Sequence, residues 1–164
     1  MTVPAEPLAS RVHRLLRERG ETVAVAESLT GGRLSAALAE APGASETFRG
    51  GLIVYATDLK ASLAGVPADL LAERGPVDGD VAAQLAAGAR TRCRADWGLA
   101  TTGVAGPESH GGKQPGTVWL GIADAAGTRA EKLALAGTRA QITQATVVLA
   151  LETLAAALTG ESRG

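Results

Sequence analysis

The stretch TVAVAESLTGGRLSAALAEA, residues 22–41, decides the fold class of this chain. Residues 22–26 form a short run of valine, alanine and threonine, which is typical of a buried strand. Residues 33–41 place leucine and alanine at the spacing of an amphipathic helix. The segment between them is polar and ends in two glycines, so we expect a strand that passes directly into a helix near Ser28 to Gly32.

The alternation of strands and helices continues through the rest of the chain. The patterns predict helices over residues 8–19, 57–65, 67–75, 78–94 and 138–158. They predict strands over residues 49–56, 97–102, 116–124 and 129–135, the last two as a hairpin. A hairpin adds an antiparallel pair to an otherwise parallel sheet. We therefore predict an α/β fold: a single layered α/β domain over residues 1–164, with tails at about 1–6 and 160–164, whose mixed β-sheet is flanked by helices.

The composition excludes several classes of protein. Hydrophobic types make up 46% and charged types 20% of the chain, which is typical of a globular protein rather than a disordered one. A net charge of −1 offers no electrostatic platform for nucleic acid. The single cysteine, Cys93, rules out a disulfide framework. We expect His13 at the surface of its helix and find no second ligand near His110, so no metal site is predicted.

The early part of the chain lacks the pattern of a targeting segment. Glu6 and several arginines interrupt its apolar runs, so we expect no signal peptide. We also expect no membrane span, because one needs about 18 consecutive apolar residues. These features favour a soluble, cytoplasmic protein.

The first candidate site is the glycine-containing turn over residues 27–32. It places the hydroxyl of Ser28 beside backbone N–H groups at the start of a helix, an arrangement that can stabilise an oxyanion. Thr30, Gly31 and Gly32 belong to the same turn. The alternative is that Ser28 or Thr30 caps the helix, which is the commoner role of a hydroxyl at this position.

Two further loops contain groups that could take part in catalysis or ligand binding. Tyr55 and Lys60 follow the second strand, and a buried lysine can act as a base beside a serine, which arginine cannot do. The alternative is that Tyr55 only packs at the end of the strand and that Lys60 is a solvent-exposed charge on the helix. Residues 101–107 form a glycine-containing loop whose backbone N–H groups could meet a phosphate or carboxylate. The chain contains neither a P-loop nor a dinucleotide-binding glycine fingerprint.

Five segments, in this order, resemble the C-terminal domain of the CinA family (competence-damage-inducible protein A). They are AESLTGG at 26–32, FRGGLIVYATDLKASLAGV at 48–66, TGVAGP at 102–107, PGTVWLGIA at 115–123 and GTR at 137–139. Stand-alone members of this family include nicotinamide-nucleotide amidases. The resemblance therefore implies hydrolysis of the carboxamide of nicotinamide mononucleotide to nicotinic acid mononucleotide and ammonia, a step of pyridine-nucleotide salvage.

The resemblance also implies roles for individual residues. Ser28 matches the nucleophile of the family, and Tyr55 and Lys60 match the tyrosine and lysine that activate it. The matches to the oxyanion turn and to the substrate-binding groups are Thr30, Gly31, Gly32, Thr102, Gly103, Ala105, Gly106 and Arg139. We expect no cofactor and no metal, and we expect a small-molecule pyridine nucleotide, rather than nucleic acid or membrane, as the binding partner.

The chain departs from the family pattern at two positions. Asp78, itself a good helix cap, stands where the family often has serine. Thr143 stands where the family often has a second arginine, so phosphate or carboxylate binding is expected to be weaker or differently arranged. An alternative function is a non-catalytic pyridine-nucleotide-binding or regulatory module of the same family. A third is an interaction domain whose alanine-rich helices form a homo-oligomer, and this is compatible with the amidase because family members are often oligomeric.

Overall fold

The central strand β3 (Trp97–Gly103) organises a five-stranded sheet in the computed structural model, which describes residues 2–161. The strand order is β2-β1-β3-β4-β5. β1 (Val23–Glu27) pairs in parallel with β3 and with β2 (Phe48–Ile53). β4 (Thr117–Asp124) and β5 (Gly127–Ala134) add an antiparallel hairpin. The predicted α/β fold with a mixed sheet is confirmed.

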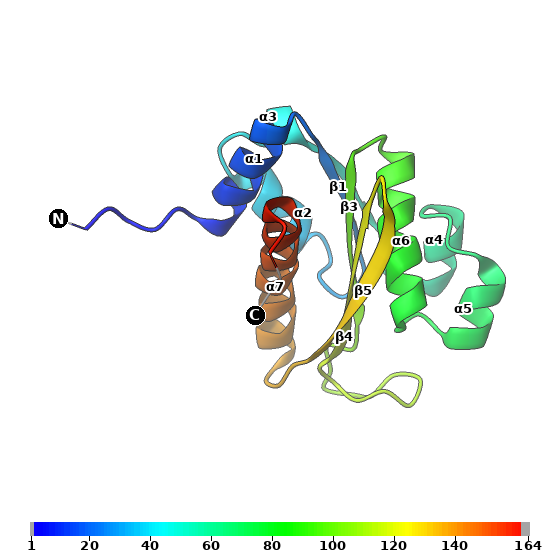
Figure 1. The fold of residues 1–164 in the computed structure, drawn as a ribbon. Helices are drawn as coiled ribbons and strands as arrows, with labels where there is room; N and C mark the ends of the chain where they lie inside the picture. Colours follow the sequence, from blue (N-terminus) through cyan, green and yellow to red (C-terminus); the bar gives the residue numbers. More distant parts are fainter. Residues whose placement is uncertain (1, 162–164) are drawn as a thin grey trace.

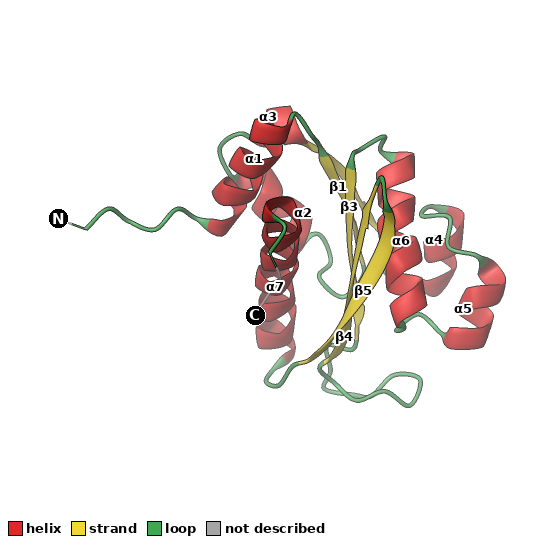
Figure 2. Ribbon diagram, in the orientation of Figure 1, coloured by secondary structure: helices red, strands yellow, loops and turns green. Residues whose placement is uncertain are grey.

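Helices cover both faces of this sheet (Figures 1 and 2). One face carries α1 (Leu8–Arg19), α2 (Arg33–Glu40), the short α3 (Ala44–Thr47) and α7 (Arg139–Thr159). The other face carries α4 (Thr57–Ser62), α5 (Ala68–Arg74) and α6 (Gly79–Arg92). Because helices lie on both sides, β1 is buried along its whole length and β3 is buried except for its last residue.

The observed elements differ from the predicted ones mainly at their ends. β2 ends at Ile53 rather than at residue 56, because its one neighbour in the sheet, β1, ends at Glu27, which is opposite Ile53. The next two carbonyl groups accept hydrogen bonds from the side chain of Lys60 instead. α4 ends at Ser62 rather than at residue 65, and β5 begins at Gly127 rather than at residue 129. α3 was not predicted, since its four residues are too few to show a helical period.

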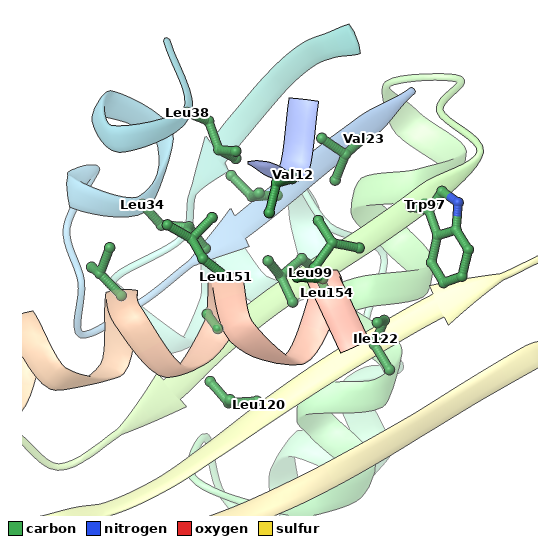
Figure 3. Packing of buried hydrophobic residues seen from close by; sticks show 14 of the residues in the cluster. Val12, Val23, Leu34, Leu38, Trp97, Leu99, Leu120, Ile122, Leu151 and Leu154 are labelled. Carbon is green, nitrogen blue, oxygen red and sulfur yellow. The ribbon is translucent and has the colours of Figure 1, made fainter. Parts of the chain in front are cut away.

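α7 supplies much of one core layer. Leu151 and Leu154 on this helix belong to the same buried cluster as Leu99 and Leu120 of the sheet and Val12 of α1, as Figure 3 shows. Within residues 2–161, α7 is the one helix that is long and apolar enough, by length and composition alone, to cross a membrane. Half of its most apolar window is buried inside the protein. We therefore assign α7 as a core helix of the domain.

His13 is buried, and the prediction that it lies at the surface was wrong. Its Nε2 lies 2.7 Å from the carbonyl oxygen of Leu38, and its Nδ1 lies 2.6 Å from the hydroxyl of Thr47. A carbonyl oxygen only accepts, so Nε2 carries a proton and donates it to Leu38. The ring thus joins α1 to α2 and α3. The helical pattern of α1 could not show this, because α3 was not predicted.

Glycine and alanine allow α6 to lie directly against the sheet. A Cβ atom on Gly98 of β3 would lie 1.9 Å from the carbonyl oxygen of Ala86. One on Gly121 of β4 would lie 2.0 Å from the carbonyl oxygen of Ala82. At these points strand and helix backbones meet with no side chain between them, so even a methyl group has no room.

We expect Gly121→Ala to destabilise the protein by about 3 kcal/mol, the upper end of the range for overpacking. The clash is with the backbone of α6, which cannot move aside as a flexible side chain could. Urea unfolding followed by circular dichroism measures the change. Ala126→Ser in the exposed β4–β5 turn serves as the control and should change stability by less than about 0.5 kcal/mol. Equal stability of the two variants would contradict the close packing.

Candidate active site

Glu27 holds the turn that carries the candidate nucleophile. This last residue of β1 is fully buried, and its carboxylate accepts hydrogen bonds from the N–H of Leu34 (2.8 Å), the N–H of Ser35 (3.0 Å) and the hydroxyl of Ser35 (2.6 Å). The N-cap position of α2 is Gly32, which makes no side-chain capping bond. Glu27 therefore satisfies the first turn of α2 from the preceding strand, and the alternative that Ser28 or Thr30 caps this helix was wrong.

Ser28 follows directly at the carboxyl end of β1. Its N–H donates to the carbonyl oxygen of Thr101 on β3 (3.1 Å), which extends the parallel pairing by one residue. Thr30 is fully buried, and its hydroxyl bonds to the hydroxyl of Thr101 at 2.8 Å. The turn is thus held to β3 by both backbone and side-chain bonds, which leaves the Ser28 hydroxyl free to face a different element.

That element is α4, which brings Lys60 to Ser28. The Lys60 side chain is 1% exposed, and its Nζ lies 3.0 Å from the Ser28 Oγ. Nζ also donates to the carbonyl oxygens of Val54 (2.7 Å) and Tyr55 (3.2 Å). A neutral amine has two N–H groups, and these two carbonyls only accept. In the neutral form, therefore, both N–H groups bind carbonyls and the lone pair points toward the serine hydroxyl.

Burial changes the acidity of Lys60. It lowers the pKa of the amine from its ordinary value of 10.5 to about 8. The three oxygens in contact with Nζ are neutral groups, so no negative charge compensates for the loss of water. Desolvation is the cause of this shift. At pH 7 about one Lys60 side chain in ten is then uncharged, whereas an ordinary lysine is almost entirely protonated.

Arg139 connects the end of β2 to the loop after β3. It is the first residue of α7, as predicted, and the preceding Thr138 caps this helix in a capping box with Gln141. One terminal nitrogen of Arg139 donates to the Tyr55 hydroxyl (2.9 Å) and the other to the carbonyl oxygen of Gly106 (2.8 Å). The backbone carbonyl of Tyr55 thus accepts a hydrogen bond from Lys60, and its hydroxyl accepts one from Arg139. The Tyr55 side chain is exposed to solvent.

A cavity of about 530 Å³ opens over these groups. It lies where the carboxyl ends of β1, β2 and β3 meet. β1 is followed by α2 on one face of the sheet, whereas β3 is preceded by α6 on the other face. In open α/β sheets such crevices are the usual ligand sites. The predicted site residues that line it are Ser28, Tyr55, Lys60, Thr102, Gly103, Ala105, Gly106 and Arg139.

Three predicted residues do not line this cavity. Thr30 is buried behind the turn, and Gly32 is the N-cap of α2. Gly31 lines a separate hollow, and its N–H donates to the carbonyl oxygen of Ser28 (3.1 Å). Leu29, which sequence reasoning passed over because its side chain is apolar, lines both the cavity and the hollow.

Sequence reasoning also missed one wall of the cavity. It is lined by Pro76 and Val77, in the connection between α5 and α6. The Thr102 hydroxyl donates to the carbonyl oxygen of Pro76 (2.6 Å), and Lys113 at the far end of the loop donates to the carbonyl oxygen of Val77. These contacts tie the loop to the α5–α6 connection. No local pattern indicates them, because their partners lie 26 and 36 residues apart.

Comparisons with known proteins match this arrangement to one family. The CinA C-terminal domain family matches residues 5–158. A CinA-like protein from Frankia casuarinae is 48% identical over 146 residues, which make up 89% of this chain and 34% of that protein. The chain spans about a third of the length of this and other curated relatives that it matches.

Solved structures of the same superfamily share the fold over almost their whole length. The crystal structure of competence damage-inducible protein A from Klebsiella pneumoniae gives a TM-score of 0.90 at 29% identity, covering 93% of this chain and 95% of that one. The competence/damage inducible protein from Agrobacterium tumefaciens gives a TM-score of 0.85 at 33% identity, covering 97% and 99%.

The shifted pKa of Lys60 predicts a pH-dependent stability. Between about pH 8 and 10.5 the unfolded chain binds a proton at Lys60 that the folded chain does not, so stability rises with pH across this window. The full cost of keeping Lys60 buried is present below pH 8 and corresponds to about 3 kcal/mol. The measurement is the free energy of unfolding from pH 7 to 10.5, taken as the difference between the native protein and Lys60→Met.

Taking the difference between the two proteins also removes the contributions of other titratable groups to the pH dependence of the unfolding free energy. Burial raises the pKa of Cys93, which gives the opposite slope but is common to both proteins. A difference that stays constant from pH 7 to 10.5 would show that Lys60 titrates as an ordinary lysine.

Proposed function

Because this chain belongs to the family of CinA C-terminal domains, we propose that it is an amidase that hydrolyses the carboxamide of nicotinamide mononucleotide to nicotinic acid mononucleotide and ammonia. The observation that carries the proposal is the 3.0 Å contact between the Lys60 Nζ and the Ser28 Oγ at a cavity large enough for a nucleotide. A serine beside a desolvated amine with a pKa of about 8 is suited to nucleophilic attack.

Attack begins with neutral Lys60. As the Ser28 Oγ bonds to the carboxamide carbon, Nζ takes the hydroxyl proton and becomes an ammonium. The carbonyl oxygen of the substrate becomes an oxyanion and needs a donor. The N–H groups of Gly31 and Arg33 already donate to backbone oxygens of the turn, so we assign the donor to the N–H of Leu29, which is adjacent to Ser28 and lines the cavity.

Collapse of the tetrahedral intermediate breaks the carbon–nitrogen bond. The Lys60 ammonium gives its proton to the departing nitrogen, which leaves as ammonia, and an ester to Ser28 remains. Water then attacks this ester while Lys60, again neutral, takes a proton from the water. The second collapse returns the proton to the Ser28 Oγ and releases the carboxylic acid. The carbonyls of Val54 and Tyr55 keep Nζ in place in both protonation states.

The remaining site residues orient the substrate in this proposal. Arg139 presents a fixed positive charge between the Tyr55 hydroxyl and the Gly106 carbonyl, which suits an anionic group of the substrate. The scheme uses no cofactor and no metal. We propose that the protein acts in the cytoplasm on a small pyridine nucleotide, as a homo-oligomer.

A second candidate is a pyridine-nucleotide-binding or regulatory module that does not turn over its ligand. Thr143, in place of the second arginine of the family pattern, favours it because one anchoring charge is then absent from this position. The buried contact between Ser28 and Lys60 favours the amidase, because a binding module has no need to bury an unpaired lysine at a free energy cost.

We expect Ser28→Ala to fold normally and to release no ammonia from nicotinamide mononucleotide. The Ser28 Oγ lies 3.0 Å from the Lys60 Nζ and is the attacking atom of the scheme, whereas loss of one hydroxyl at a strand end perturbs packing little. Ammonia release by purified protein measures the activity, and circular dichroism verifies the fold. Normal turnover by this variant would replace the covalent route with direct attack by water.

Lys60→Arg distinguishes a base from a simple positive charge. Guanidinium does not lose its proton at the pH of the assay, so activity should fall by about 100-fold or more, the scale of a lost general base. The native enzyme should show a kcat/KM that rises with pH through about 8. Lys132→Arg on the exposed side of β5 is the matched control and should retain full activity. An active Lys60→Arg with an unchanged pH profile would remove Lys60 from the mechanism.

A further inference from the structure

A second hollow of about 400 Å³ adjoins the cavity of Ser28 and Lys60. Leu29, Tyr55 and Arg139 line both spaces, so one extended ligand can occupy the two together. The hollow also contains Arg33 from the first turn of α2. It was not foreseen from the sequence, in which the two arginines lie more than a hundred positions apart.

The charged side chains that line this hollow are positive. Arg33 and Arg139 line it, and no carboxylate is among its lining residues within the described part of the chain. Within residues 2–161, the side chain of Arg33 makes one hydrogen bond, from a terminal nitrogen to the carbonyl oxygen of Thr30 at 3.3 Å. Each guanidinium has five N–H groups, so both retain donors for a ligand after their protein contacts. Paired guanidinium groups bind the oxygens of a phosphate with high geometric specificity.

The large cavity is less suited to a phosphate. The carboxylate of Glu108 lines it and would repel a dianion. At the end of β3 the Thr102 hydroxyl donates to Pro76, and in the loop that follows the N–H of Val104 donates to the carbonyl oxygen of Thr117. These two donors are therefore unavailable to a ligand. The two guanidinium groups of the hollow, which retain donors and have no carboxylate beside them, favour the hollow over the loop.

We propose that this hollow binds the phosphate monoester of the substrate and that Arg33 is a specificity-determining residue that selects phosphorylated over unphosphorylated nicotinamide ribosides. This inference rests on the proposed amidase function. The ligand extends from its carboxamide at Ser28, past the shared wall of Leu29 and Tyr55, to its phosphate between Arg33 and Arg139. The phosphate thereby fixes the distance at which the amide meets the nucleophile.

Binding to the Ser28→Ala protein tests this without turnover. Isothermal titration calorimetry compares nicotinamide mononucleotide with nicotinamide riboside, on Ser28→Ala alone and combined with Arg33→Ala. We expect Arg33→Ala to weaken binding of the mononucleotide by about 10- to 100-fold, the scale of a lost charge-assisted hydrogen bond, and to leave the riboside unaffected. Arg33→Lys should recover part of the loss, because it keeps the charge without the planar fork.

Arg129→Ala is the matched control for the change in net charge. Arg129 lies exposed on β5, pairs with Asp124 and lines neither space. It should change neither affinity. Equal weakening of both ligands by Arg33→Ala, or no weakening of either, would overturn the proposal, since the first indicates a structural role and the second places the phosphate elsewhere.

Ribose 5-phosphate separates failure of this inference from failure of the amidase function. If the native protein does not deamidate the mononucleotide but binds ribose 5-phosphate with the same dependence on Arg33, the phosphate site stands and the amidase is wrong. If the native protein deamidates the mononucleotide and Arg33→Ala leaves its KM unchanged, the amidase stands and the phosphate site is wrong.

Discussion

The three hydrogen bonds of the Glu27 carboxylate are the interaction on which the site depends. A buried charge is costly unless it is fully hydrogen-bonded, and here the start of α2 supplies all three donors and the positive end of a helix dipole. The bonds fix the angle between β1 and α2, and thus the path of residues 28–32. Without them the first turn of α2 would lose its acceptors, and the turn that carries Ser28 would be held only by its bonds to Thr101 of β3.

Close packing of backbones allows the rest of the sheet to support this turn. α6 meets β3 and β4 at glycines, so its backbone lies directly against the sheet on that face. On the other face, α7 combines two roles. Its apolar residues fill the core, and its capped N-terminus delivers Arg139 to the mouth of the cavity. The site is therefore assembled from segments of both layers at one edge of the sheet.

Lys60 shows the compromise between stability and function. Complete burial of an amine among neutral oxygens destabilises the charged form and so destabilises the folded protein at neutral pH. The same burial produces an uncharged amine next to a hydroxyl group. The carbonyls of residues 54 and 55, directly after the end of β2, accept hydrogen bonds from this amine. The segment that follows β2 thus positions the base.

The sequence by itself determined the order of strands and helices, the mixed α/β class, the three loops with reactive side chains and the family resemblance. These are local properties: the period of apolar residues, the glycine turns, and the residue types within short segments. The tertiary structure alone decided that His13 is buried, that Glu27 caps α2, that Lys60 contacts Ser28 directly, and that Arg33 and Arg139 line one hollow. Each of these depends on the packing of elements against one another, as with Ser28 and Lys60, which are 32 positions apart. Such contacts follow from how helices and strands are placed in space, and the periodicity of a single element contains no information about that placement.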